Sequence, residues 1–297
     1  MPSGLLVVGD VVTDVVARHA RPLAADTDTA ARIAVRPGGA GANVACWAAG
    51  RGARVRLLAR AGADSADWHR AALEAAGVEP VLRVDDEAPT AVVIALVDAA
   101  AERTLVTDSG AAFRLGPADW DEALLDGMGH VHLSGYLYFS EWGRELAAVV
   151  TEAARARSLP VSVDPASAGF LREAGVARFL ADVAGTDLLL PNDAEAALLS
   201  GVPEPARAAA ELSAARGGGT VVVTLGAGGA LAAVNGEVTV RVPCVPAVAV
   251  DTTGAGDAFT GGLLAARLAG ADLAASLAAG CRTGAEAVTV VGGRPET

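Results

Sequence analysis

The chain has 297 residues, enough for one large α/β domain or two small ones, and 52% of them are apolar. Aromatic residues make up only 4%, so Ala, Val and Leu must fill most of the core. The net charge of −12 and a pI near 4.8 argue against long-range attraction to nucleic acid or anionic lipid, so neither is expected as a partner.

The basic residues of the chain are all arginine. This excludes the phosphate-binding lysine of P-loop proteins, the strand lysine of protein kinases and Schiff-base chemistry. If the protein handles a nucleotide, then backbone amides, arginine and metal must bind its phosphates. The three cysteines are far apart and form no CxxC pair, so neither a disulfide framework nor a structural zinc site is expected.

The sequence begins Met-Pro-Ser-Gly and runs directly into an apolar, strand-like segment. No basic region and no long apolar stretch accompany this start, so no signal peptide or membrane span is expected. The sequence therefore predicts a soluble protein of the cytoplasm.

Short apolar runs alternate with Ala-rich helical patterns along the chain. The apolar runs read as buried parallel strands at Leu5–Val8, Val55–Ala59, Val131–Leu133, Val161–Val163, Leu188–Leu190 and Val221–Leu225. The helical patterns fall at about 42–50, 65–76, 140–157, 193–200, 205–215 and 257–269. This alternation predicts an α/β fold, with a doubly wound sheet and helices on both faces. Ligands of such a fold bind at the carboxyl ends of the strands.

Two regions, at about 11–36 and 81–108, break this rhythm with strand-like segments that no crossover helix joins. The segments are Val11–Ala17, Arg32–Val35, Ala91–Asp98 and Arg103–Thr107, the last two around a turn at Ala99–Glu102. Both regions read as inserted hairpin strands, which can leave the main sheet and form a small β-sheet lid over a substrate site. Residues 1–297 are therefore predicted to be one domain with a lid, ending in a short irregular tail after Val291.

The stretch at 251–268, DTTGAGDAFTGGLLAARL, carries the strongest functional signal. Gly254, Ala255 and Gly256 are small, so successive backbone N–H groups can converge on one anion, and the helix that follows adds its dipole. Asp257 lies in the first turn of that helix, close to the same anion. A glycine loop before a helix can be purely structural, but no capping rule requires the flanking DTT and FTGG. The stretch therefore predicts phosphoryl transfer.

The chemistry of phosphoryl transfer assigns the parts of this motif. The transition state is loose, so the protein contributes positioning and charge stabilisation. The amides of Gly254, Ala255 and Gly256 would stabilise the migrating group, and Asp257 would align the attacking hydroxyl and accept its proton late. The helix dipole and neighbouring amides are expected to keep the Asp257 carboxylate ionised.

Two motifs near the N-terminus offer partners for substrate hydroxyl groups. The run PGGAGAN at 37–43 is a glycine turn that lets the backbone approach a ligand, and Asn43 carries both a donor and an acceptor. A structural glycine turn at a helix start is an equally good interpretation. Asp10 and Asp14 follow the first strand, where a carboxylate suits vicinal hydroxyls; turn capping is favoured for Asp10 and substrate binding for Asp14.

Two weaker motifs follow later strands. In the run PNDAE at 191–195, Asn192 and Glu195 lie one helical turn apart, so both can face one water-coordinated cation. The same spacing is that of a capping box, and both interpretations stay open. The run TLGAGG at 224–229 is either a second phosphate or nucleotide contact or a β-turn.

Taken in order, these motifs resemble those of the ribokinase/PfkB family of carbohydrate kinases, over nearly the whole chain. The two family signatures read here GGAGANVACWAAGRGARV and DTTGAGDAFTGGLLAARL, and the second is highly specific. The resemblance implies a ribokinase-like three-layer α/β/α core with a mainly parallel sheet of eight or nine strands and a small β-sheet lid. It also implies transfer of the γ-phosphate of ATP to a sugar hydroxyl, with magnesium and often a monovalent cation such as potassium.

The resemblance further implies roles for single residues. Asp257 matches the catalytic base, with the anion hole at Gly254, Ala255 and Gly256. Sugar contacts match at Asp14, Gly38, Gly39 and Asn43. Contacts to the nucleotide, its phosphates and magnesium match at Asn192, Glu195, Thr224, Gly226, Gly229 and Cys281, with Glu195 reaching magnesium through water. The loop for a monovalent cation matches at Asp251 and Thr253, completed by a turn at 288–292.

Two departures from the family pattern concern the substrate. Ala40 is present where ribokinases have the lysine of GGKGAN, and Ser134-Gly135-Tyr136 where they place an acidic sugar ligand. A ketose, a sugar acid or a nucleoside therefore fits as well as ribose. The alternatives are a nucleoside kinase, with Tyr136 or Phe113 stacking on the base, and a non-catalytic sugar-binding protein. Lids of this family often pair between subunits, so exposed strand edges at 91–98 or 103–107 would favour a homodimer.

Overall fold

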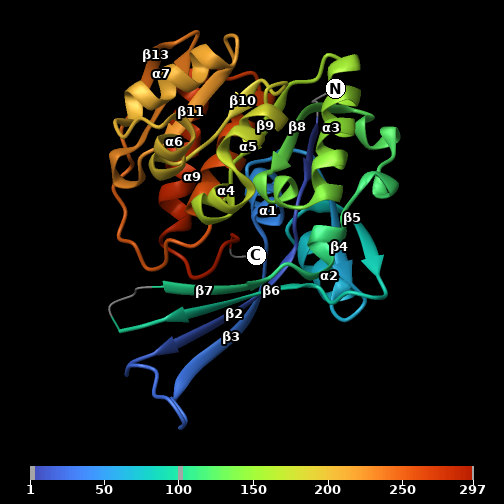
Figure 1. The fold of residues 1–297 in the computed structure, drawn as a ribbon, viewed down its shortest axis with the longest axis vertical. Coiled ribbons are helices and arrows are strands. Elements are labelled where there is room, and N and C mark those ends of the chain that lie inside the picture. The colour runs from blue at the N-terminus through green and yellow to red at the C-terminus, as the bar shows by residue number, and fades with distance from the viewer. Residues whose placement is uncertain (1–3, 100–102, 296–297) are drawn as a thin grey trace.

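The computed structural model describes residues 4–99 and 103–295, which form two β-sheets with helices packed on the larger one (Figure 1). The larger sheet has nine strands in the order β13-β12-β11-β10-β9-β8-β1-β4-β5. Neighbours from β11 to β5 are parallel, and β12 and β13 add an antiparallel edge. The strands are β1 (Gly4–Val8), β4 (Val55–Gly62), β5 (Val78–Asp85), β8 (Met128–Ser134), β9 (Val161–Asp164), β10 (Leu188–Leu189), β11 (Thr220–Thr224), β12 (Ala230–Val234) and β13 (Glu237–Val242). The predicted mainly parallel sheet is confirmed.

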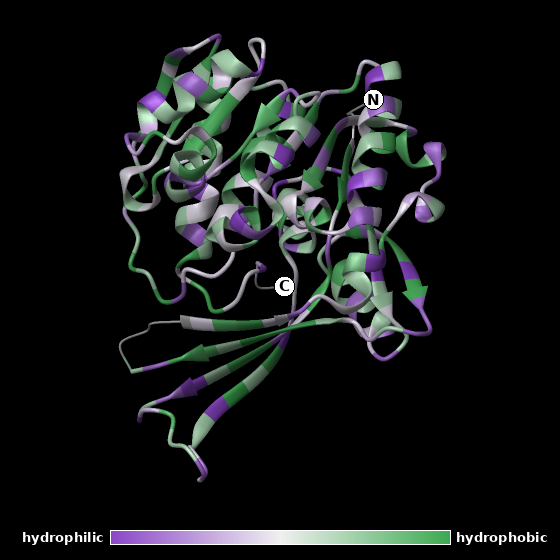
Figure 2. Cartoon of the chain, viewed as in Figure 1, coloured by the Kyte–Doolittle hydropathy of each residue, from purple (hydrophilic) through white to green (hydrophobic). Residues whose placement is uncertain are grey.

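Helices cover both faces of this sheet because its strands are apolar on both sides. Leu5 and Val7 of β1 pack with one set of helices, and Leu6 and Val8 with the other. The first set is α1 (Ala40–Gly50), α2 (Ala66–Ala75), α8 (Ala255–Leu268) and α9 (Leu273–Ala287). The second set is α3 (Glu141–Ala156), α4 (Ala168–Ala174), α5 (Val176–Asp182), α6 (Asp193–Ser200) and α7 (Pro205–Ala215). Figure 2 shows the strands between them as largely hydrophobic.

Short 3-10 helices lie in the connections of the fold. They are η1 (Gly110–Arg114), η2 (Pro117–Asp119), η3 (Glu122–Leu125), η4 (Gly135–Phe139) and η5 (Gly226–Gly228). Across the described ranges, no helix has both the length and the apolar character needed to cross a membrane.

A second sheet of four strands, in the order β3-β2-β6-β7, extends from the body at the bottom of Figure 1. Its strands are β2 (Val12–His19), β3 (Ala31–Gly38), β6 (Ala91–Val97) and β7 (Arg103–Asp108). β2 pairs with β6 in parallel, and the other pairs are antiparallel. The predicted small sheet is confirmed. The prediction of an exposed edge at 91–98 is wrong, because β6 pairs with a strand on each side, whereas β7 does lie at an edge. The turn predicted at Ala99–Glu102 falls largely on residues 100–102, which lie outside the described part of the chain.

The prediction of inserted strands from about residue 81 is wrong at its start. Residues Val78–Asp85 form β5, which pairs in parallel with β4 at the edge of the large sheet. An edge strand is only partly buried, so its mixture of apolar and charged residues resembles that of a lid hairpin. The second inserted segment therefore begins at Ala91.

The two faces of the small sheet carry different side chains. On the inner face, Val12, Asp14 and Val16 of β2 line a cavity against the body. On the outer face, a row of cross-strand neighbours runs across all four strands and consists of Val35, Val15, Ile94 and Val106. This outer row is apolar, and three of its members are exposed by 58% (Val35), 39% (Ile94) and 54% (Val106).

Candidate active site

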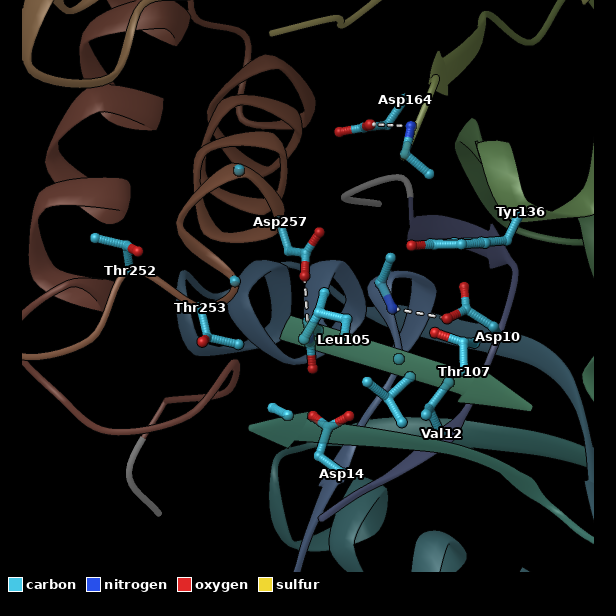
Figure 3. A pocket seen from close by; sticks show the side chains of 18 of the residues that line it. Asp10, Val12, Asp14, Leu105, Thr107, Tyr136, Asp164, Thr252, Thr253 and Asp257 are labelled. Atoms are coloured by element: carbon cyan, nitrogen blue, oxygen red, sulfur yellow. Dashed lines mark hydrogen bonds between the residues drawn. The ribbon is translucent and has the colours of Figure 1, made fainter. Parts of the chain in front are cut away.

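A cavity of about 670 Å³ lies between the small sheet and the carboxyl ends of β1, β8, β9 and β11. Side chains from β2, β7 and the first turn of α8 point into it from different sides (Figure 3). The predicted site residues that line it are Asp14, Gly39, Asn43, Asn192, Glu195, Thr224, Asp251, Thr253, Gly254, Gly256 and Asp257. The fold thus gathers residues from most of the chain at the edge where a doubly wound sheet binds its ligands.

Helix α8 presents an N-terminus without a side-chain cap to this cavity. Gly254 is the N-cap residue, with a left-handed φ of 73°, and as a glycine it offers no side chain to cap the first turn. The helix begins at Ala255, two residues earlier than predicted, so the amides of Ala255, Gly256 and Asp257 all belong to its first turn. N–H groups of a first turn lack intrahelical acceptors, and together with the helix dipole they suit an anion such as phosphate.

Asp257 accepts a hydrogen bond from Asn43, with 2.8 Å between Oδ2 and Nδ2 (Figure 3). Burial raises the pKa of Asp257 well above the usual range; the Asn43 hydrogen bond lowers it, and the charges of Asp164, Asp10 and Asp14 raise it. In setting this pKa, desolvation and the nearby carboxylates outweigh the expected stabilising effect of the helix end on the ionised form. A higher pKa makes the carboxylate a stronger base for a hydroxyl proton.

Asp10 caps the glycine turn, as the sequence favours. Its Oδ2 accepts a hydrogen bond from the amide of Ala40 at 2.8 Å, and its Oδ1 from the amide of Gly41 at 3.1 Å and from Ser134 Oγ at 2.9 Å. Gly39 has a φ of 102°, and a Cβ there would lie 2.6 Å from the carbonyl oxygen of Asp10. The turn needs glycine because two backbone segments meet beneath the cavity.

Asp14 points into the cavity from β2 (Figure 3). A Cβ at Gly38 would collide with the Asp14 carboxylate, so Gly38 contributes space for this carboxylate rather than a wall of the cavity. Burial raises the pKa of Asp14 to about 6; the charge of Arg294 lowers it, and those of Asp10 and Asp251 raise it. Near neutral pH, Asp14 is an ionised acceptor for hydroxyl groups.

Asn192 and Glu195 form the capping box of α6, which confirms the structural interpretation of this motif. The Glu195 amide donates to Asn192 Oδ1 at 2.8 Å, and the Asn192 amide donates to Glu195 Oε2 at 3.0 Å. Both residues also line the cavity. Burial raises the pKa of Glu195, and the charge of Asp164 raises it further.

Asp164, at the end of β9, is a cavity residue that the sequence prediction missed. Burial raises its pKa, although the amide of Ala166 donates to it at 2.9 Å. Glu195 is buried and Asp164 partly buried, so a cation between them would compensate the charge of the two carboxylates. Magnesium is typically bound by one or two carboxylates plus phosphates and water. Asp164 and Glu195 fit such a site, whereas the described ranges contain no group of three His, Cys, Asp or Glu residues that could hold a metal ion.

Only some of the predicted nucleotide-contact residues line the cavity. Thr224 lines the cavity at the end of β11, where it forms a β-bridge with Asn192. Gly226 and Gly229 lie outside the cavity lining, and a Cβ at Gly229 would collide with the backbone at the end of β13. Cys281 also lies outside the lining, because its side chain is buried in the core between α9 and the sheet. Packing explains Cys281 and Gly229, and their contact with a nucleotide stays a prediction.

Asp251 and Thr253 lie in one turn before α8. Asp251 Oδ1 accepts hydrogen bonds from the amide and the hydroxyl of Thr253, at 3.0 and 2.7 Å. Asp251 Oδ2 accepts one from the amide of Gly292 at 3.2 Å and lies 3.6 Å from Arg18 Nη2. The loop thus contacts the predicted 288–292 segment, and Arg18 places a positive charge beside its carboxylate. Binding of a monovalent cation here stays a prediction.

The segment after α9, residues 288–295, is irregular, as predicted for the part after Val291, and it contacts the site. Trp47 Nε1 donates to the carbonyl oxygen of Gly293 at 2.9 Å. Arg294 Nη2 donates to the carbonyl oxygen of Gly38 at 2.7 Å, and Arg294 Nε to Asn43 Oδ1 at 3.3 Å. No local sequence signal marks Arg294, since it is a single arginine near the end of the chain.

Comparison with known proteins gives matches along the whole chain. The family described as pfkB family carbohydrate kinase matches residues 3–297. A fructokinase of Klebsiella pneumoniae is 32% identical over 274 residues, which cover 89% of this chain and 84% of that protein. The bifunctional protein HldE of Pseudomonas paraeruginosa is 31% identical over 297 residues, with 94% of this chain covered but only 60% of that protein.

Among solved structures, a putative ribokinase II of E. coli in complex with ATP and Mg²⁺ has a TM-score of 0.86 and 26% identity, with 98% of this chain and 94% of that chain covered. The family match spans the small sheet, the glycine turn of α1 and the first turn of α8, which are the parts that build the cavity. The chain therefore belongs to the pfkB family of carbohydrate kinases and is a phosphotransferase.

Proposed function

We propose that this protein transfers the γ-phosphate of ATP to a hydroxyl group of a small sugar or sugar acid. The observation that carries this proposal is the position of Asp257: it lies in the uncapped first turn of α8 and shares one cavity with Asp14. An anion site, a base and a carboxylate for hydroxyl groups thus adjoin one another, as transfer to an alcohol requires. Because ATP is the donor, the proposal places the reaction in the cytoplasm.

Each part of the cavity has a role in this reaction. Asp257 accepts the proton of the attacking hydroxyl, and Asn43 orients its carboxyl group. The amides of the first turn of α8 stabilise the negative charge of the transferred group. Asp14 binds sugar hydroxyls, and the glycines at 38 and 39 leave room for it and for the backbone. Glu195 and Asp164 would hold magnesium, which neutralises phosphate charge when bound.

ATP turnover with a panel of pentoses, hexoses, sugar acids and nucleosides tests the proposal. At least one sugar or sugar acid should stimulate ADP formation, and removal of magnesium with a chelator should abolish it. Folded protein that no member of the panel stimulates would contradict the proposal. Calorimetric binding of a sugar without any turnover would instead favour a non-catalytic sugar-binding protein.

A nucleoside acceptor is the second candidate, because aromatic side chains line part of the cavity. Tyr136 and Phe113 are lining residues, and both contact Phe170 edge to face, with ring centroids 5.7 and 6.2 Å apart. Such rings can stack on a base or pack on the apolar face of a sugar. Product analysis with adenosine, cytidine and pseudouridine against the best sugar separates the two.

The affinity for the sugar is expected to fall as the pH decreases through about 6, because burial raises the pKa of Asp14 to about that value. Above it, the ionised carboxylate accepts hydrogen bonds from two hydroxyl groups; below it, the protonated group must donate one of them. Loss of one charge-assisted hydrogen bond should weaken binding about tenfold. Equilibrium binding measured from about pH 5 to pH 8 gives this profile.

Asp14→Asn isolates the contribution of this one carboxylate. The variant should bind the sugar weakly at every pH and lose the pH dependence. Asp86→Asn is the control, since Asp86 is exposed and lies outside the cavity lining. If Asp14→Asn kept the wild-type profile, another group would have to be the one that titrates.

We also propose that the protein forms a homodimer through the outer face of the small sheet, where Val35, Ile94 and Val106 expose an apolar row. Ile94→Glu places a charge within that row and should convert a dimer into a monomer in light scattering. Val149→Glu on α3 is the control, because Val149 has the same exposed fraction of 39%. A wild-type protein with the mass of a monomer would contradict this.

A further inference from the structure

The side-chain amide of Asn43 is hydrogen-bonded on both sides. Its Nδ2 donates to Asp257 Oδ2 at 2.8 Å, and its Oδ1 accepts from Arg294 Nε at 3.3 Å. Asn43 lies on α1 and Asp257 on α8, while Arg294 follows α9 and lies 251 residues from Asn43 in sequence. Three distant parts of the chain thus meet at one amide group.

This arrangement fixes which end of the amide faces the base. A guanidinium group has only donors, so the Asn43 atom that faces Arg294 must be the carbonyl oxygen. The NH₂ group then faces Asp257, where it can donate to an ionised carboxylate. Without the guanidinium, rotation of the amide could bring its oxygen to the carboxyl group, and this contact would repel the ionised form.

The Arg294 side chain is held by hydrogen bonds to two different elements, α1 and β3. Its Nη2 donates to the carbonyl oxygen of Gly38 at 2.7 Å, so the same side chain also contacts the end of β3. A Cβ at Gly293 would lie 2.5 Å from Asn43 Nδ2, which shows how closely the segment passes the amide. Burial lowers the pKa of Arg294, while the charges of Asp14 and Asp10 raise it. Burying a guanidinium is unfavourable unless its hydrogen bonds compensate. Nε and Nη2 each donate one, whereas Nη1 has no hydrogen-bond partner among the described residues.

We propose that Arg294 is a positioning residue for phosphoryl transfer: its hydrogen bond to Asn43 Oδ1 holds the amide NH₂ toward Asp257 in the first turn of α8. This inference rests on the proposed function, in which Asp257 is the base. It gives the segment after α9 a part in the chemical step, because the orientation of Asn43 decides whether the carboxylate receives a donor or an acceptor.

Arg294→Met tests this role because it keeps the apolar stem and removes every donor. The kcat at saturating sugar should fall about ten- to hundredfold. The KM for the sugar should rise near neutral pH, because the Arg294 charge that lowers the pKa of Asp14 is lost. Arg294→Lys keeps the charge but offers one ammonium group in place of the guanidinium fork, so it should recover only part of the loss. In an Asn43→Ala background, Arg294→Met should change kcat by less than about twofold, because its effect acts through Asn43.

Arg36→Met is the matched control. Arg36 Nη1 donates to the carbonyl oxygen of Val291 at 2.8 Å, so it holds the same segment, but it does not contact Asn43. This variant should leave kcat within about twofold of wild type. If Arg36→Met lowered kcat as much as Arg294→Met, anchoring of the segment and not the orientation of the amide would explain both losses.

The NMR signals of the Asn43 NH₂ group provide a readout that needs no turnover. In the wild-type protein, the Asn43 NH₂ proton that is hydrogen-bonded to Asp257 should have a shifted resonance and be protected from exchange with water. Arg294→Met should abolish both effects. Unchanged signals in Arg294→Met, or equal losses of kcat with and without Asn43, would overturn the inference. Wild-type protein without any turnover would instead count against the proposed function, and the NMR test would still decide the orientation.

Discussion

Asp257→Asn is expected to lower kcat by at least about a thousandfold and to leave the KM for the sugar within about threefold. The carboxamide has nearly the shape of the carboxyl group, and its oxygen can still accept the hydrogen bond from Asn43. It cannot accept the proton of the attacking hydroxyl. Assays of ADP formation at saturating ATP, with the sugar varied, measure both constants.

The large expected effect follows from the environment of this carboxyl group. Burial and the neighbouring carboxylates raise the pKa of Asp257, so the ionised form takes up a proton more readily than an exposed aspartate does. Asp193→Asn is the matched control, because Asp193 also lies in the first turn of a helix, α6, but is exposed. That variant should stay within about twofold of wild type. An Asp257→Asn enzyme of wild-type activity would mean that a different group accepts the proton.

Local sequence signals predicted the large sheet and several helices well. The central strands are buried on both faces, so they read as uninterrupted apolar runs. Helices α6 and α7 begin and end at the predicted residues because strong signals mark their ends: Asn192 caps α6, Gly201 ends it, and Pro205 begins α7.

Helix α9 was not predicted, because its sequence weakens the helical signal. Gly280 and Gly284 interrupt an Ala-rich run, and glycine inside a helix is usually unfavourable. A Cβ at Gly280 would lie 2.8 Å from the ring of Phe259, so close packing of α9 on α8 requires glycine there. Tertiary packing therefore overrides the local preference, and a single sequence does not reveal which helix will approach so closely.

The catalytic side of the site could be predicted because each of its parts belongs to a short local motif. Gly254 and Asp257 belong to one turn, and Asn43 follows the glycine turn of α1. Asp164 directly follows a predicted strand, just as Asp10 follows an earlier one, but this placement also describes a capping residue. Arg294 contributes through a contact made only when the chain folds, so its role could not be predicted from neighbouring residues.

Gly254→Ala is expected to lower kcat by about a hundredfold or more, as loss of a preorganised amide donor does in other enzymes. A Cβ at Gly254 would lie 2.6 Å from Cα and 2.7 Å from the carbonyl oxygen of Gly293. Both are backbone atoms, so either the first turn of α8 or the segment after α9 must move. The first movement displaces the amides that face the phosphoryl group, and the second displaces Arg294 and with it the amide of Asn43.

Gly201→Ala separates backbone strain from this collision. Gly201 has the same φ of 73° as Gly254, but a Cβ there would meet no atom within 4 Å. Gly201→Ala should lose roughly 1 to 2 kcal/mol of unfolding free energy in urea titrations, because alanine disfavours the left-handed backbone. Gly254→Ala should lose more, because its methyl group also meets the Gly293 backbone. Only Gly254→Ala should lose activity, because only there does the methyl group reach atoms that hold the site. Equal kcat in the two variants would mean that the first-turn amides do not stabilise the transferred group, and Asp257 and magnesium would have to account for the rate.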